Sequence, residues 1–452
     1  MRGDRYPSAT WLLVRPRGGS TAVFAMQVVA AAVATLLSFA VAIVALTFWR
    51  VPAAEPAYRV LALALAVLLA LPLTALSSAA ARLSARSREE RLATLRLLGV
   101  SAPRVRRLAV AESTAVAAIG VAVGTALGSL LPFALQFFPV HGSRLGPADL
   151  ALPWWLTLVI PLALIGVAAL SGLLGLRKVI LSPLGVSART DAPRMSWARV
   201  FLTVGAVGAA VAVTRAVSPG WGLPAAVAAL SLALLASMAA LSALGPFVLL
   251  WFARRRAARA ADPAKLIAFR TVADAPRAAW RGVSVIALAT FIVVPVGSLL
   301  GYLDAIQRSE SGALLTQEQL FLLRDARSLL VVLAAVAFLV ATCQLAMAQV
   351  ASIIERRELF IALHRIGMQL PTMQRSRLRS ATLPAVAAVT IALAATAALT
   401  APVIFAGAVT SPLFTLTVAA VLLCGLALVA VCVAATAPVL RQELARDGGG
   451  SR

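Results

Sequence analysis

The sequence predicts an all-α polytopic membrane protein, and three observations lead to this class. Hydrophobic residues make up 61% of the 452 residues and charged residues only 13%, whereas soluble domains average about 25% charged residues. The mean hydropathy is +0.94. The apolar residues occur in long runs, and only helices or closed barrels satisfy their backbone hydrogen bonds inside a bilayer.

Ten of these runs are long enough to cross about 30 Å of hydrocarbon at roughly 1.5 Å per residue. We expect spans at residues 20–48, 59–83, 108–138, 152–176, 198–217, 223–252, 282–303, 328–354, 380–406 and 412–438. The longest segment between spans on the outer side, 304–327, has mixed charge, and we expect a short surface helix there. We expect no large extracellular domain.

The basic residues give the predicted protein an orientation. All but seven of the 41 Lys and Arg residues fall in segments on one side of the predicted membrane. Cytoplasmic loops of membrane proteins carry this excess, so we expect that side, with both termini, to face the cytoplasm. The same placement accounts for the net charge of +24 without a nucleic-acid partner.

The spans divide as four, two and four. We expect a first four-span unit at residues 1–190, a connecting two-span pair at 191–260 and a second four-span unit at 261–452. Because an even number of spans separates the two units, they run in the same direction. The arrangement is therefore a 4+2+4 parallel pseudo-twofold repeat with its axis along the membrane normal.

The clearest sign of the repeat is a charged segment between the second and third span of each unit. Residues 88–99 and 356–367 align at an offset of 268 positions, with Arg on Arg, Glu on Glu, Leu on Leu and Gly on Gly. The aligned pairs are Arg88 and Arg356, Glu90 and Glu358, Leu95 and Leu363, Gly99 and Gly367, and Pro103 and Pro371. This pattern predicts an amphipathic helix that ends at a glycine and is followed by a helix starting near a proline.

One face of each predicted helix is apolar and the other is charged. Leu92, Leu95 and Leu98 form the apolar stripe of the first copy, and Leu359, Leu363 and Ile366 form that of the second. We expect these stripes to hold the helices against the ends of the neighbouring spans.

This pattern resembles the FtsX-like permease family of ABC transporters, over nearly the whole chain. Members of the family have a similar helix, E-x-A-x-L-R-A-L-G, followed by a basic stretch and a span that carries a Glu and several Gly. The corresponding residues here are Arg104, Arg106, Arg107, Glu112, Gly120, Gly124 and Gly128. The end of the first unit, Arg177 to Leu184 with its Ser-Pro, is also similar to the family.

The resemblance implies a permease subunit whose energy comes from a separate ABC ATPase, expected in two copies, in the bacterial plasma (inner) membrane. The repeated helices would be the ATPase-docking coupling helices. The docking residues that it implies are Arg88, Glu89, Glu90, Leu95, Arg96, Gly99, Arg356, Arg357, Glu358, Leu363, His364 and Gly367. ATP and Mg²⁺ would be bound by the partner, because this chain has no G-x-x-x-x-G-K-[ST] loop.

We expect no catalytic, cofactor or metal site in this chain, and hence no enzyme activity of its own. The expected function is export or extraction of a hydrophobic or amphipathic compound, such as a lipid, antibiotic or peptide. The alternative is a transmembrane mechanotransmitter or sensory permease that signals to an extracytoplasmic or kinase partner without transport. An accessory membrane or sensor protein is a further candidate partner. A third class, an ion-coupled transporter, would need acidic residues near mid-membrane, where only Glu112 comes close.

Several residues have a plainer interpretation beside the functional one. The charged helices could be solvated cytoplasmic loops, although repeated Glu and Gly at fixed spacing favour docking. Glu112 is either an interfacial partner of a nearby Arg or a link between docking helix and span. The glycines of G-x-x-x-G-x-x-x-G favour helix packing within the protein over dimerisation. We interpret His141 as an ordinary loop residue rather than a substrate or pH sensor.

Two further observations complete the expectations. Trp49, Trp154, Trp155, Trp251 and Trp280 lie near predicted membrane edges, as in an aromatic belt. The second unit has Ser380 in place of Glu112, and Ala388 and Ala392 in place of two glycines. We therefore expect the two units not to be equivalent.

Overall fold

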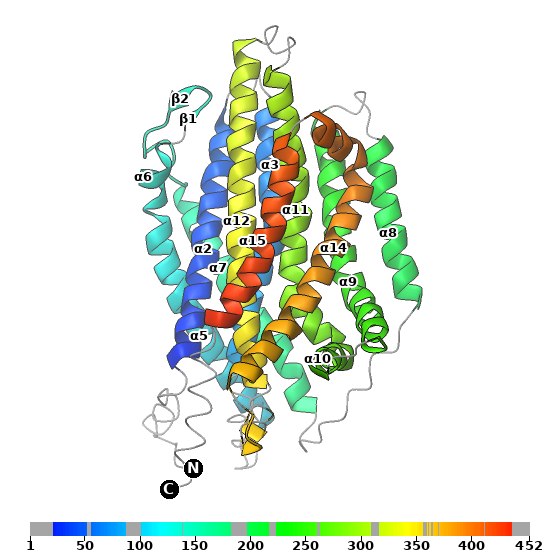
Figure 1. Cartoon of the computed structure of the whole chain (residues 1–452). Helices are drawn as coiled ribbons and strands as arrows, with labels where there is room; N and C mark the ends of the chain where they lie inside the picture. The colour runs from blue at the N-terminus through cyan, green and yellow to red at the C-terminus, as the bar shows by residue number, and fades with distance from the viewer. Residues whose placement is uncertain are drawn as a thin grey trace, which may run out of the picture.

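The computed structural model is a bundle of long helices with one small β-hairpin (Figure 1). It describes residues 21–51, 56–86, 101–137, 139–181, 197–216, 223–259, 263–308, 316–355, 359, 361–362, 365–368, 370–410 and 412–435. The long helices of the first half are α2 (Thr21–Arg50), α3 (Pro56–Arg86), α5 (Ala102–Gly128) and α7 (Trp154–Leu181). Next come α8 (Trp197–Ala216), α9 (Leu223–Ala257) and the short α10 (Pro263–Asp274), followed by α11 (Pro276–Arg308), α12 (Gln317–Glu355), α14 (Leu370–Thr410) and α15 (Pro412–Ala435).

Each predicted span coincides with one of the long helices. Eight helices in the described part contain a stretch long and apolar enough to cross a membrane, in α2, α3, α5, α7, α9, α11, α12 and α14. The apolar stretch of α8, Phe201–Ala216, is shorter, and α15 is not among the eight. The chain is thus an all-helical, multi-pass membrane protein apart from the hairpin, and the count of ten spans stays a prediction.

Two stretches differ from the sequence prediction. The predicted span 108–138 ends early, because α5 stops at Gly128 and is followed by the five-residue helix α6 (Leu131–Leu135). Pro132 lies in the first turn of α6, where a residue without an N–H fits a helix start and not the middle of a span. The chain then forms the antiparallel strands β1 (Pro139–Val140) and β2 (Ser143–Arg144).

The expected loop with a surface helix at 304–327 is also wrong in part. Here α11 continues to Arg308 and α12 already begins at Gln317, so both spans extend into this segment. Thr316 and Gln319 form a capping box, in which each backbone N–H donates to the other residue's side-chain oxygen, at 3.1 and 3.4 Å. With 39 residues, α12 is about 58 Å long and exceeds the hydrocarbon thickness.

The two ends of the bundle differ in character. At one end lie the β-hairpin and α6, drawn at the upper left of Figure 1, and this is called the hairpin end. At the other end lies α10, near the bottom of the picture. Arg254, Arg255 and Arg256 finish α9 there, and Arg104, Arg106 and Arg107 lie in the first turns of α5. This is called the basic end, and it is the predicted cytoplasmic side.

The same helix pairing occurs in both halves. In the first half α2 packs against α3 and α5, and α5 packs against α7. In the second half α11 packs against α12 and α14, and α14 packs against α15. The halves meet along α3 and α12, while α9 lies against α3, α11 and α14. One continuous hydrophobic core runs through α2, α3, α9, α11, α12 and α14.

The three predicted packing glycines of α5 lie directly against α2. A Cβ at Gly120 would come within 2.5 Å of the Val28 carbonyl oxygen, and one at Gly124 within 2.5 Å of the Ala32 carbonyl oxygen. A Cβ at Gly128 would meet the Phe39 ring at 2.8 Å. These glycines therefore let two backbones approach within the chain, as small residues do at helix interfaces in membranes.

The second half makes the corresponding contact with alanines. Ala388 and Ala392, which align with Gly120 and Gly124, are fully buried in α14, the helix that packs against α11. Loss of the glycines therefore leaves a small-residue face in place.

One tryptophan prediction is wrong. Trp49, Trp154, Trp155 and Trp251 are exposed, but Trp280 is buried. A Cβ on Gly245 of α9 would overlap the indole ring of Trp280 in α11. Trp280 therefore packs between α11 and α9 at Gly245 and does not lie at a membrane surface.

We predict that Gly124→Ala lowers the thermal stability of the purified protein, whereas Gly166→Ala does not. The new methyl group at 124 overlaps the α2 backbone, and overpacking of this kind costs about 1–3 kcal/mol. Gly166 of α7 has no atom within 4 Å of an added Cβ. The measurement is thermal unfolding in detergent, and equal melting temperatures for the two variants would contradict the close α2–α5 contact.

Candidate functional site

The structure describes none of the first predicted docking segment, residues 88–99, and only part of the second, residues 356–367. Arg88, Glu89, Glu90, Leu95, Arg96 and Gly99 of the first copy, and Arg356, Arg357, Glu358, Leu363 and His364 of the second, lie outside the described residues. Their docking role stays a prediction.

The described residues around the segments have the backbone geometry that the pattern predicts. Gly367 has a φ of 93°, the left-handed conformation of a C-cap glycine. The N–H of Ile366 donates to the carbonyl oxygen of Ala362 at 3.1 Å, which closes the last turn. The next helix begins at Leu370 with Pro371 following, and α5 begins at Ala102 with Pro103 following. The helix end at Gly367 and the two proline starts are thus confirmed.

Two of the three residues of the second copy's apolar stripe are described, and neither is buried against the bundle as expected. The side chain of Ile366 is 83% exposed and that of Leu359 is 53% exposed. Both residues lie between the candidate spans that end at Ile353 and begin at Met373. Residues seven apart lie on one helix face, so this face is open to a partner at the basic end.

Glu112 is half-buried in α5, within the candidate span Pro103–Gly128. Its aligned residue in the second half, Ser380, is half-buried in α14 and lines a cavity described below. The two aligned positions therefore have different chemical surroundings. A role for Glu112 in coupling stays a prediction.

The hairpin end contains a buried polar junction between the two halves. Asp325 of α12 is only 2% exposed. Its Oδ2 atom accepts a hydrogen bond of 2.8 Å from the hydroxyl of the fully buried Tyr58 of α3. The same oxygen accepts one of 2.7 Å from the backbone N–H of His141 in the hairpin turn. One carboxylate oxygen therefore joins α3, the hairpin and α12.

Aromatic rings surround this junction. The His141 imidazole stacks on the Tyr58 ring with the ring centres 5.8 Å apart, and its edge faces Phe321 at 5.6 Å. Phe48 lies against the other side of Tyr58 at 5.6 Å. His141 has a φ of 51° and Gly142 a φ of 73°, so the tight turn places the His141 N–H against the carboxylate.

Sequence reasoning missed this junction. His141 was interpreted as an ordinary loop residue, and Tyr58 and Asp325 were not singled out. The His-Gly pair signals a tight turn, but nothing local identifies its partner, because Tyr58 and Asp325 are 267 positions apart.

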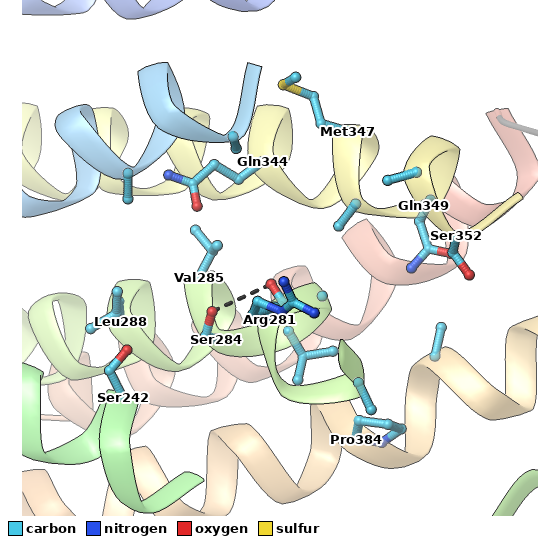
Figure 2. A pocket seen from close by; sticks show the side chains of 18 of the residues that line it. Ser242, Arg281, Ser284, Val285, Leu288, Gln344, Met347, Gln349, Ser352 and Pro384 are labelled. Carbon is cyan, nitrogen blue, oxygen red and sulfur yellow. Dashed lines mark hydrogen bonds between the residues drawn. The ribbon is translucent and has the colours of Figure 1, made fainter. Parts of the chain in front are cut away.

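An open cavity of about 690 Å³ lies toward the basic end, lined by residues of α3, α9, α10, α11, α12 and α14. Figure 2 shows Gln344, Gln349 and Ser352 of α12 on one side, and Arg281 and Ser284 of α11 on the other. Val285 and Leu288 continue the α11 wall. The volume lies within the roughly 300–1,000 Å³ range of small-molecule sites.

The wall of the cavity carries many polar side chains. The hydroxyl- and amide-bearing side chains on its wall are Ser78, Ser242, Thr271, Ser284, Gln344, Gln349, Ser352 and Ser380. The Gln344 Nε2 donates to the carbonyl oxygen of Pro72 at 3.0 Å, which joins α12 to the proline-containing turn of α3.

Comparison with known families assigns the class. The fold and its two ends define a multi-pass helical membrane protein with an exposed helix face at its basic end. The model of the family described as FtsX-like permease C-terminal matches residues 61–183. This segment contains most of α3, all of α5 and α7, and the predicted docking helix at 88–99. A comparison with curated protein sequences finds no match.

The chain therefore contains an FtsX-like permease domain at residues 61–183. Such a domain implies the permease of an ABC transporter, which is typically a non-catalytic transmembrane subunit. Among the described residues, no group of three or more His, Cys, Asp or Glu side chains could hold a metal ion.

We predict that Asp325→Ala destabilises the protein by about 2–4 kcal/mol and Tyr58→Phe by about 1–2 kcal/mol. The first change leaves two buried donors without an acceptor, and the second removes one donor. Asp325→Asn, which keeps an oxygen acceptor, should cost less than Asp325→Ala. Thermal and denaturant unfolding of the purified chain measure these effects.

The junction predicts coupling between the two residues. Tyr58→Phe should cost less in the Asp325→Ala background than in the unmodified chain. Asp149→Ala is the matched control, because Asp149 is an exposed carboxylate at the same end that accepts from the Gly146 N–H. Strictly additive effects of the Tyr58 and Asp325 changes would show that the two side chains do not interact.

Proposed function

We propose that this chain is the permease subunit of an ABC exporter, with two fused four-span units and two ATPase subunits as partners. The units are residues 1–190 and 261–452, and the connecting pair is 191–260. The partners bind ATP and Mg²⁺. The complex exports or extracts a hydrophobic or amphipathic compound from a bacterial plasma membrane, with both termini of the chain in the cytoplasm.

The observation that carries this proposal is the recurrence of one helix arrangement in both halves. The family match covers most of α3 and all of α5 and α7. In the second half, α12, α14 and α15 each pack against α11, and α14 packs against α15 as α5 packs against α7. A unit that repeats a permease domain supports a second docking position on the same chain.

The contacts between the halves support a parallel repeat. Across α3 and α12, Tyr58 bonds to Asp325 and Pro72 to Gln344, at separations of 267 and 272 positions. These separations are close to the repeat offset of 268. Residues at equivalent heights of the two units therefore face each other, as expected beside a pseudo-twofold axis along the membrane normal.

The exposed face with Leu359 and Ile366 supports docking at the basic end. Apolar side chains of this size gain about 1.5–3 kcal/mol when a partner covers them completely. Charged neighbours on the same segment would orient the partner and make its association sensitive to salt. Closure of the ATPase pair would push both coupling helices and rock the units about the α3–α12 contact.

The cavity favours transport over signalling alone. A transmitter without a substrate has no need of a site of about 690 Å³ among its spans. The cavity lies beside α3 and α12, where rocking of the units would change its access.

We predict that an ABC ATPase co-purifies with the tagged full-length chain from its native membranes, at two copies per chain. The measurement is affinity purification in mild detergent, followed by mass spectrometry and by ATP hydrolysis in proteoliposomes. Absence of any ABC ATPase from the purified complex would contradict the proposed function.

The docking face is tested in the same preparation. Ile366→Asp should weaken ATPase binding by roughly 10- to 100-fold, since a charge replaces a buried apolar contact. Glu90→Lys together with Glu358→Lys should also release the ATPase. The control is Phe137→Asp, because Phe137 is 73% exposed near the opposite end. If Ile366→Asp retains the ATPase as well as the control does, the docking assignment fails.

A further inference from the structure

The side chains that line the cavity change in character along its depth, from charged and polar near the basic end to aliphatic deeper in the bundle. Arg281 is the only charged side chain among its lining residues, all of which the structure describes. Seven residues further along α11, Leu288 marks the deeper part, about 10 Å away along the helix axis. The cavity therefore runs from a guanidinium group near the basic end to an aliphatic wall inside the bundle.

The uncharged polar side chains are also concentrated toward the basic end of the cavity. Gln349 and Ser352 lie on the last turns of α12 before Glu355, and Thr271 comes from α10 beyond the spans. Val285, Leu288 and Ala239 line the deeper part, with Gln344 as the deeper amide. Figure 2 shows Arg281 between α11 and the α12 side chains, with Val285 and Leu288 further along α11.

A second guanidinium lies close to the wall. Arg377 is buried in α14, four residues before the lining residue Ala381 and seven before Pro384. Positions spaced by four and seven share a helix face, so Arg377 lies one turn nearer the basic end on the α14 face that lines the cavity. The hydroxyl of Ser380 donates to the backbone carbonyl oxygen of Arg377 at 2.9 Å.

This arrangement favours ligands that are anionic over ligands that are cationic. No acidic side chain lines the cavity to attract a cation. Arg281 is exposed, and its Nε donates to the carbonyl oxygen of Arg277 at 3.2 Å. Guanidinium groups bind phosphate and carboxylate oxygens through paired N–H donors. Ser78, Ser284, Ser380 and Gln344 already donate to backbone carbonyl oxygens. The further donors for an oxyanion would therefore be the side chains of Gln349 and Ser352 on α12.

We propose that this cavity binds a compact anionic amphiphile, with its phosphate or carboxylate head at Arg281 and its apolar tail along Val285 and Leu288. The volume of about 690 Å³ is that of a drug-sized ligand and favours a single-tailed molecule over a two-chain phospholipid. The inference rests on the proposed function for the ligand's role as a substrate, and it names the substrate class. The binding itself needs no ATPase.

The test is native mass spectrometry of the purified full-length chain without an ATPase. The probes are lysophosphatidylglycerol, which is anionic, and lysophosphatidylcholine, which is zwitterionic and has the same tail. Inorganic phosphate is added as a competitor to distinguish a site for a free anion from one for an amphiphile. We expect preferential binding of one lysophosphatidylglycerol, with little displacement by phosphate.

Two variants identify the site. Arg281→Gln should lower the apparent affinity for the anionic probe at least about tenfold. The loss should be smaller for the zwitterionic probe, because its choline cation already offsets the charge of its phosphate. The control for this variant is Arg277→Gln, an exposed arginine one turn earlier on α11 that does not line the cavity. Gly282→Leu, where an added Cβ meets no atom within 4 Å, should fill the cavity and reduce both probes.

Gly208→Leu is the control for added volume, because Gly208 of α8 is equally open and does not line the cavity. Equal binding of the anionic probe to the unmodified chain, Arg281→Gln and Gly282→Leu would overturn the proposal, as would absence of binding to the unmodified chain. Either result would leave ATPase co-purification untouched, so failure here is distinguishable from failure of the permease assignment.

Discussion

The contact between α3 and α12 is the constraint on which the rest of the structure depends. Helices inside lipid gain little from the hydrophobic effect when they associate, so close packing and buried hydrogen bonds must hold them together. Two such bonds cross this contact, from Tyr58 to Asp325 near the hairpin end and from Gln344 to Pro72 deeper in the bundle. They fix the register of two parallel helices. Each half is then completed through α2, which packs against α3 and α5, or through α11, which packs against α12 and α14.

The helices of the two halves pair in a similar way, but different elements pack around each half. The hairpin that carries His141 belongs to the first half and reaches across to α12. On the other side, α9 and α10 lie against the second half, where they complete the cavity lined by Arg281 and Ser380. In the proposed function, two ATPase positions would therefore act on one substrate site, and the expected difference between the units would lie in what surrounds them.

Much of this organisation could be predicted from the sequence, because long apolar runs and local caps are local signals. The helix end at Gly367 and the helix starts beside Pro103 and Pro371 could be predicted because glycine favours helix ends and proline favours helix starts. Span ends were less predictable. Pro132 ended a span inside an apolar run, and Thr316 with Gln319 began α12 inside an apparent loop.

The sites depend on contacts between distant residues, and here sequence reasoning was weakest. The partners of Asp325 lie 184 and 267 positions away, and no local pattern identifies them. Trp280 has the position of a membrane-edge residue but fills the space opposite Gly245. Leu359 and Ile366 were expected to pack against the neighbouring spans, yet both are exposed. Residue spacing shows which side chains share a helix face, but it does not show what covers that face.

The central claim is that ATPase partners at the basic end move the two halves relative to each other about α3 and α12. Arg107 and Arg375 are aligned, exposed positions at the starts of α5 and α14, so spin labels there report on both units. Cys343, Cys424 and Cys432 would first be replaced. We predict that the distance distribution between the labels shifts when ATP is added to the complex with its ATPase, and that it does not shift with ADP. An identical distribution with ATP, with ADP and without the ATPase would contradict the account.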